Sequence, residues 1–153
     1  MQYMLLIYLD ETTLSDAARE ECYIKSAQFA QELNAKGQYL AASPLHPTST
    51  ATSLRIRDGK PVVTDGPFAE TREQLGGYYL IDVPDLDQAI DIAARIPAGK
   101  WGTVEIRPVM EIEGLPVDKI SRAVDFAAAD VYKQPLALAT RQRGLDQRAA
   151  YKA

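Results

Sequence analysis

The chain has 153 residues, of which 46% are hydrophobic, enough apolar material for a single core, and its net charge is -4. Its apolar runs are all shorter than the roughly 18 to 20 residues of a membrane-spanning helix, and its start, MQYMLLIYLDE, lacks the basic flank of a secretion signal. We therefore expect a cytoplasmic protein with no membrane partner. The single cysteine, Cys22, excludes an internal disulfide framework and a cysteine-rich zinc site.

The charge is distributed unevenly along the chain. Residues 1–114 carry 10 Lys and Arg against 17 Asp and Glu, a balance of -7, whereas residues 115–153 carry 7 against 4, a balance of +3. Nucleic acids are bound by clustered positive charge, so we expect no direct nucleic-acid binding by the main domain. The basic C-terminal part either docks on the acidic domain, reaches an acidic partner, or forms a solvated helix face.

The first elements along the chain are predicted to be a strand, a helix and a second strand. Residues 2–9, QYMLLIYL, are apolar and short, which is typical of a strand buried on both faces or at an interface. Ser15 is expected to cap a helix over about residues 15–36, and Gly37 supplies its C-terminal stop. The segment QYLAASPL then predicts a short strand that ends at its proline.

A β-hairpin is predicted next. Leu54 and Ile56 alternate along its first strand, Asp58-Gly59 is a strong turn signal, and residues 62–63 begin the return strand.

The last three elements are a strand, a helix and a strand. GYYLIDV, residues 77–83, is rich in aromatic and β-branched side chains and predicts a strand. Residues 103–112, TVEIRPVMEI, alternate apolar with charged side chains and predict a strand with one buried and one polar face. Between them, Asp85 is expected to cap a helix with one apolar face that holds Leu86, Ala89, Ile90 and Ala93.

This order predicts an α+β, ferredoxin-like βαββαβ domain with an inserted hairpin over residues 1–114. Helices cover only one face of such a sheet, and the simplest cover for the other face in so small a chain is a second copy, so we expect a homodimer. Residues 115–153 are expected to form a C-terminal helical extension. Its apolar residues at helical spacing are Ile120, Val124, Ala127, Ala128 and Val131.

The segment from residue 63 to residue 79, VTDGPFAETREQLGGYY, contains an Asp-Gly-Pro turn, two further acidic residues and a Gly-Gly pair, which is more than a chain reversal needs. The Asp-Gly-Pro turn redirects the chain out of the hairpin, and the pair Gly76-Gly77 lets the backbone pass closely against a neighbour. Asp65 is a candidate general acid or base if it lies in a cleft with apolar walls. The alternative is that it caps its own turn by bonding backbone amides.

Further candidates are the carboxylates and the histidine near this segment. Glu70 and Glu73 could form acid–base pairs or supply oxygen ligands to a hard cation, but no other ligand cluster accompanies them and no metal site is predicted. An exposed loop, or an ion pair with Arg72 or Arg107, explains them more simply. His46, the only histidine, is either a proton carrier or a surface or packing residue.

Glu105 and Arg107 point to the polar face of the last strand. If that face lines the space between two sheets, Arg107 could hold a ligand carboxylate bidentately; the alternative is an interfacial ion pair. Phosphate-loop, dinucleotide-binding, Gly-x-Ser-x-Gly and His-Glu-x-x-His motifs are missing from the sequence, so no cofactor is predicted.

Several of these segments closely resemble the DGPF-type branch of the YCII-related family over roughly residues 1–113. The resemblance rests on VTDGPFAETREQLGGYYLIDV, DLDQAIDIAARIP and GTVEIRPVMEI, and extends to the opening strand and to LAASPLHPTSTATSLRIRDGKP. It implies a dimeric α/β barrel. The YCII branch is suspected of enzymatic activity through a His and Asp pair, and the DGPF branch often occurs beside extracytoplasmic-function sigma factors. Here residues 23–26 read YIKS where the YCII pattern has a histidine on the first helix.

Two hypotheses about function follow. The leading one is a homodimer of unassigned activity that binds a small organic molecule near Asp65, His46, Glu70, Glu105 and Arg107, with acid–base chemistry of lyase or isomerase type. The competing one is a non-catalytic regulatory or interaction module, for instance one that acts with a sigma factor. An enclosed pocket lined by Asp65 and a second titratable residue would favour the first, and a shallow surface the second.

Overall fold

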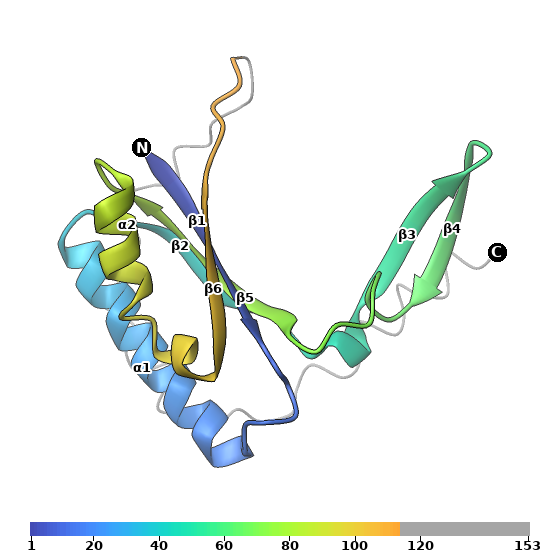
Figure 1. The fold of residues 1–153 in the computed structure, drawn as a ribbon, viewed down its shortest axis with the longest axis horizontal. Coiled ribbons are helices and arrows are strands. Elements are labelled where there is room, and N and C mark those ends of the chain that lie inside the picture. Colours follow the sequence, from blue (N-terminus) through green and yellow to red (C-terminus); the bar gives the residue numbers. More distant parts are fainter. Residues whose placement is uncertain (114–153) are drawn as a thin grey trace. The chain divides into compact units, whose positions relative to one another are not determined.

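A four-stranded antiparallel sheet with two helices on one face forms the described part of the protein (Figure 1). This computed structural model describes residues 1–113, and the expected helical extension lies outside the described residues. The strands are β1 (Gln2–Leu9), β2 (Tyr39–Pro44), β3 (Thr52–Arg57), β4 (Lys60–Asp65), β5 (Gln74–Asp82) and β6 (Gly102–Pro108). The helices are α1 (Asp16–Ala35) and α2 (Leu86–Ala93), with 3-10 helices η1 (Thr48–Thr50) and η2 (Pro97–Trp101).

The strand order of the sheet is β2-β5-β1-β6, and every neighbouring pair is antiparallel. With β3 and β4 set aside, this is the order of a ferredoxin-like α+β fold, as predicted. Strands β3 and β4 form a separate two-stranded sheet, the hairpin, which is inserted between β2 and β5. No helix in residues 1–113 is long and apolar enough to span a bilayer.

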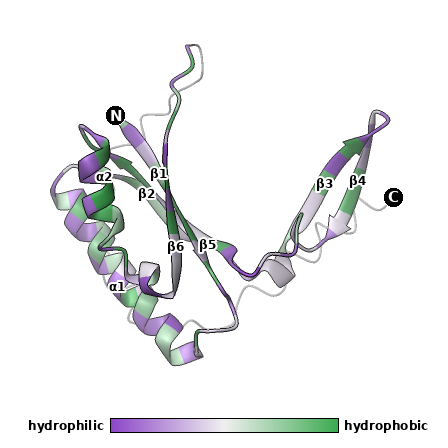
Figure 2. Cartoon of the chain, in the orientation of Figure 1, coloured by the Kyte–Doolittle hydropathy of each residue, from purple (hydrophilic) through white to green (hydrophobic). Residues whose placement is uncertain are grey.

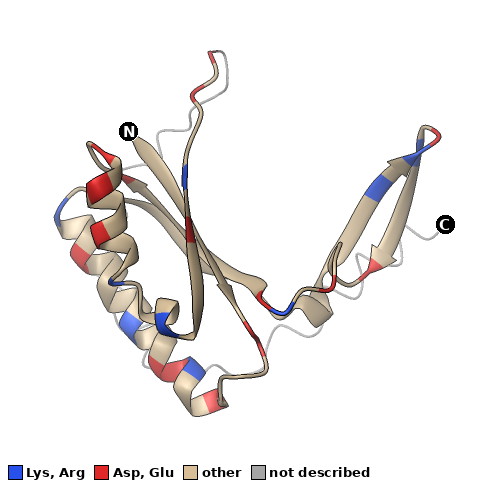
Figure 3. Ribbon diagram, viewed as in Figure 1, with Lys and Arg blue, Asp and Glu red and all other residues tan. Residues whose placement is uncertain are grey.

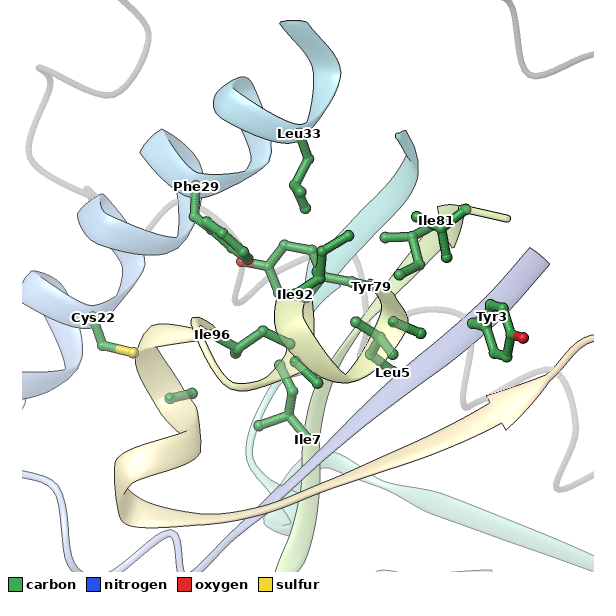
Figure 4. Packing of buried hydrophobic residues seen from close by; sticks show 14 residues of the cluster. Tyr3, Leu5, Ile7, Cys22, Phe29, Leu33, Tyr79, Ile81, Ile92 and Ile96 are labelled. Carbon is green, nitrogen blue, oxygen red and sulfur yellow. The ribbon is translucent and has the colours of Figure 1, made fainter. Parts of the chain in front are cut away.

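The core lies between the helices and one face of the four-stranded sheet (Figure 4). Alternate residues of β1 and β5 point into it, because successive side chains of a strand point to opposite faces. The buried side chains of the strands are Tyr3, Leu5, Ile7, Tyr79 and Ile81, and those of the helices are Cys22, Phe29, Leu33, Ala89, Ile92 and Ala93. Cys22 is a free thiol in this core.

The capping residues determine where the helices begin and end. The Ser15 side chain accepts a hydrogen bond from the Ala18 amide, and Asp85 accepts one from the Gln88 amide at 2.9 Å, so both predicted N-caps are confirmed. Gly37 follows α1 with φ +68°, the left-handed conformation of a C-terminal glycine stop.

The predicted apolar face of α2 is partly wrong. Leu86 and Ile90 are 49% and 47% exposed, whereas Ile92 is buried beside Ala89 and Ala93. The apolar residues of this short helix occupy more than one face, and packing on the sheet selects the face that contains Ile92. The last strand is also shorter than predicted and ends at Pro108, because its ladder partner β1 begins at Gln2.

Candidate functional site

The second face of the four-stranded sheet has no layer over it within residues 1–113. Its central side chains come from β1 and β5 and are partly exposed: Met4, Leu6, Tyr8, Tyr78 and Leu80. The register places Met4 between Leu80 and Arg107, and Leu6 between Tyr78 and Glu105. We call these five side chains the open face; they form an apolar surface with charged residues along the β6 edge.

Glu105 and Arg107 lie on β6 on the side of the open face, as predicted. The Arg107 Nε lies 3.6 Å from the Glu105 Oε1, and the two side chains are 69% and 47% exposed, respectively. An exposed ion pair of this kind contributes little to stability. The guanidinium can therefore exchange its partner for the carboxylate of a ligand at small cost.

His46, Asp65 and Glu70 are exposed and lie around the base of the hairpin. His46 follows β2, Asp65 is the last residue of β4, and Glu70 lies in the loop that leads into β5. Beyond the Thr52–Asp65 pair, the Gly66 amide donates to the Ala51 oxygen at 2.8 Å and so joins the two strands at the base of the hairpin. Gly66 has φ +95°, a conformation that favours glycine and explains the Asp-Gly-Pro sequence.

One copy of the chain does not bring these two groups together. Strands β2 and β6 are the two edges of the sheet, so they are separated by three interstrand steps, about 14 Å in total. The groups also belong to opposite ends of the strands: Pro44, two residues before His46, is level with Ile7, whereas Arg107 pairs with Met4. The candidate residues therefore occupy diagonally opposite corners of the sheet.

Glu11 is a site residue that sequence patterns did not indicate. Its Oε1 accepts a hydrogen bond from the Thr48 amide at 2.9 Å, and its Oε2 accepts one from the Thr48 hydroxyl at 2.9 Å. The Glu11 amide donates to the Gln74 Oε1 at 3.3 Å. Glu11 thus ties the segment that carries His46 to the start of β5. No local signal identifies such a contact between residues so far apart in sequence.

The buried titratable groups belong to the core and not to the candidate site. Burial raises the pKa of the Cys22 thiol, which favours the unreactive neutral form. Burial also raises the pKa of Tyr79, whose hydroxyl donates to the Ser26 oxygen at 3.1 Å. Cys22 is therefore a packing residue.

A shallow apolar depression lies between α2 and β6. Its lining residues are Ile90, Ala93, Ala94, Gly99, Val104 and Ile106. None of them is titratable, and Asp65 is not among them. Within residues 1–113, no group of three His, Cys, Asp or Glu side chains is placed to hold a metal ion.

The fold and these surfaces define a small ferredoxin-like α+β domain with an inserted hairpin and a sheet face that residues 1–113 leave uncovered. Residues 1–113 match the YCII-related domain, and the chain belongs to this family. A protein of Rhizobium meliloti (strain 1021), "Uncharacterized protein R00369", is 38% identical over 118 residues, which cover 71% of this chain and 92% of that protein. The assignment to the DGPF branch stays a prediction.

One solved structure with a similar chain path is 5-chloro-2-hydroxyhydroquinone dehydrochlorinase from Burkholderia phenoliruptrix AC1100, in complex with 2,5-dihydroxybenzoquinone. The similarity covers 73% of this chain and 96% of that enzyme, with 11% identity and a TM-score of 0.47.

Proposed function

We propose that this YCII-related protein is a cytoplasmic homodimer that binds a small organic molecule in a cleft between two copies. The observation that carries the proposal is the open face, an apolar surface with an Arg–Glu pair at its edge and no cover in the described residues. Two such faces packed together bury this apolar area and leave polar groups at the rim. Ligand sites commonly combine apolar walls with a few convergent polar groups.

The second copy supplies what a single sheet lacks. The hairpin that ends at Asp65 leaves the four-stranded sheet at the corner diagonally opposite that of Arg107, so only residues from different copies converge on one ligand. In this arrangement Arg107 and Glu105 come from one copy and Glu70 from the other, and Arg107 holds an anionic group of the ligand. Asp65 and His46 serve as general acid and base, in chemistry of lyase or isomerase type. Glu11 positions the His46 segment through Thr48.

A ligand screen with site variants tests this proposal. We expect small carboxylates from an aromatic and aliphatic panel to raise the melting temperature, and Arg107→Lys to weaken binding about tenfold, because lysine keeps the charge but loses the bidentate geometry. Asp65→Asn should retain binding and lose turnover of any ligand that reacts. Lys36→Gln, a change of an exposed residue after α1, is the control. Binding that is equal in Arg107→Lys and the control would contradict the proposed site.

A second candidate function is supported by the exposed hairpin. Leu54, Ile56 and Val63 are 56%, 64% and 48% exposed, an unusual density of apolar side chains on a two-stranded sheet (Figure 2). A non-catalytic regulatory or interaction module, for instance one acting with an extracytoplasmic-function sigma factor, would use this surface. In that case Arg107→Lys would change no small-molecule binding, and substitutions in the hairpin would weaken binding of the protein partner.

A further inference from the structure

The hairpin has one apolar face that nothing covers in residues 1–113. Cross-strand partners share a face, and the register pairs Leu54 with Val63 and Ile56 with Pro61. A two-stranded hairpin is marginally stable alone in water and needs a third strand or a packing partner. This hairpin is therefore expected to acquire a neighbour when the protein assembles.

The β3 edge of the hairpin is the edge suited to pairing. Strand β3 has β4 as its single neighbour in the described part of the chain, so its other edge is open. Its sequence alternates apolar side chains with Arg55 and Arg57, which lie on the opposite face of the hairpin. The β4 edge is less suitable because Pro61 has no amide hydrogen to donate.

The segment after β6, residues 109–113, has the complementary pattern. The Val109 amide donates to the Gln2 oxygen at 2.9 Å, and the following residues belong to no strand. Met110 and Ile112 are 79% and 56% exposed and alternate with the exposed residues Glu111 and Glu113. A segment with apolar and acidic side chains in alternation is suited, once it becomes extended, to the edge of an apolar and basic strand (Figure 3).

We propose that residues 109–113 of one copy add as a third strand to the β3 edge of the hairpin of a second copy. Because both segments have a period of two, either strand direction places apolar side chains beside Leu54 and Ile56 on one face. In the parallel direction the same register places Glu111 beside Arg55 and Glu113 beside Arg57 on the other face. In the antiparallel direction it places Glu111 beside Arg55 and Glu113 beside Ser53. Apolar and opposite-charge neighbours of this kind each stabilise a strand pair.

The two segments of one copy are placed apart by the topology. The hairpin leaves the sheet at the β2 and β5 edge, at the end where Pro44 is level with Ile7. Residues 109–113 leave at the β6 edge, at the end where Pro108 pairs with Tyr3 (Figure 1). Two copies can pack sheet against sheet about a two-fold axis that runs along the diagonal joining the remaining two corners of the sheet. The hairpin corner of each copy then lies against the β6 corner of the other copy, so the contact forms twice.

This inference rests on the homodimer of the proposed function and adds a second contact to it. Asp65 lies at the base of the same hairpin, opposite Thr52. Strand addition would hold the base of the hairpin, and with it the carboxylate, at the edge of the cleft between the sheets. The site of one copy would then be completed by the segment 109–113 of its partner.

Complementary charge reversals in the full chain test the strand addition. Variant A is R55E/R57E and variant B is E111R/E113R; each homodimer would place like charges against one another at both contacts. We expect the dissociation constant of either homodimer to rise about tenfold or more over that of the unmodified protein. A mixture of A and B should form the heterodimer preferentially, because both of its contacts are again complementary. Native mass spectrometry of the mixture measures the three dimers.

The outcomes separate this inference from the dimer itself. Preferential A–B pairing together with weakened homodimers supports strand addition, and statistical mixing with wild-type affinities overturns it while the homodimer stands. If mixing is statistical, the binding partner of the hairpin would be an acidic segment of a different protein. If the unmodified protein stays monomeric at 100 times the protein concentration used for the mixing experiment, both the homodimer and the strand addition are wrong. The mass of the unmodified protein in native mass spectrometry shows this outcome. A control variant, Lys36→Glu, should dimerise like the unmodified protein.

Discussion

The positions of some residues of the candidate site could be predicted from the sequence, and those of others could not. Asp65, Glu105 and Arg107 could be placed from the alternation of the strands and the Asp-Gly-Pro turn, and the structure has them at the predicted positions along those elements. Glu11 could not, because its contact with Thr48 depends on how the loop after β1 meets the loop after β2. Patterns of period two or 3.6 describe one element and carry no information on contacts between loops.

Replacing Glu11 by alanine should destabilise the protein. The change leaves the partly buried Thr48 amide and hydroxyl without their acceptor, which costs about 1–3 kcal/mol of the free energy of unfolding. Glu11→Gln keeps one acceptor oxygen and should cost less. Urea unfolding measures both, with Glu20→Ala, an exposed position on α1, as the control. Equal stability of Glu11→Ala and Glu20→Ala would show that the contact with Thr48 has no energetic role.

At the scale of elements, sequence predicted most of the fold. Strand alternation, the N-caps Ser15 and Asp85 and the Asp58-Gly59 turn identified every strand and both α-helices of residues 1–113 in the correct order, but not the 3-10 helices η1 and η2. Asp58 and Gly59 have φ 50° and 74°, as their turn requires. The choice of the buried face of α2 failed, since Leu86 and Ile90 are as apolar as Ile92 and only tertiary packing distinguishes them.

Close approach of strands explains two glycines, of which sequence indicated one. A Cβ on Gly77 would lie 2.9 Å from the Ser43 oxygen and 3.2 Å from the Pro44 Cα, so the glycine allows β5 to pass closely against β2, as predicted. A Cβ on Gly102 would overlap the Tyr8 backbone oxygen, and no pattern at that position signalled the constraint. Sequence shows where a glycine lies, and the neighbouring strand shows why it is needed.

Gly77→Ala should separate β2 from β5 locally. The neighbours of the added methyl group are backbone atoms, which cannot move aside as a flexible side chain does, so we expect a loss of about 1–3 kcal/mol in unfolding free energy. Hydrogen exchange of the β2 amides should accelerate in parallel. Gly99→Ala is the matched control, because its Cβ would make an ordinary 3.4 Å contact with the Val104 Cγ2. Similar exchange rates in both variants would contradict the close approach.

At the scale of the whole molecule, the open face and the hairpin present the same physical problem. Each presents apolar side chains that no layer of residues 1–113 covers, and burying those side chains would stabilise the protein. One assembly with a second copy would cover both surfaces. Sequence predicted the uncovered sheet face from the fold class, whereas the complementarity of β3 and residues 109–113 became apparent only once their places at opposite corners were known.

Leu6→Arg should therefore turn the protein into a monomer. Leu6 lies in the middle of the open face, between Tyr78 and Glu105, and a two-fold interface would bury two introduced guanidinium groups close to each other. We expect the dissociation constant to rise about 100-fold or more, and the melting temperature to lose its dependence on protein concentration. Sedimentation equilibrium measures the first and calorimetry the second. Leu86→Arg, on the exposed side of α2, should stay dimeric; a dimer with unchanged affinity in both variants would place the interface away from the open face.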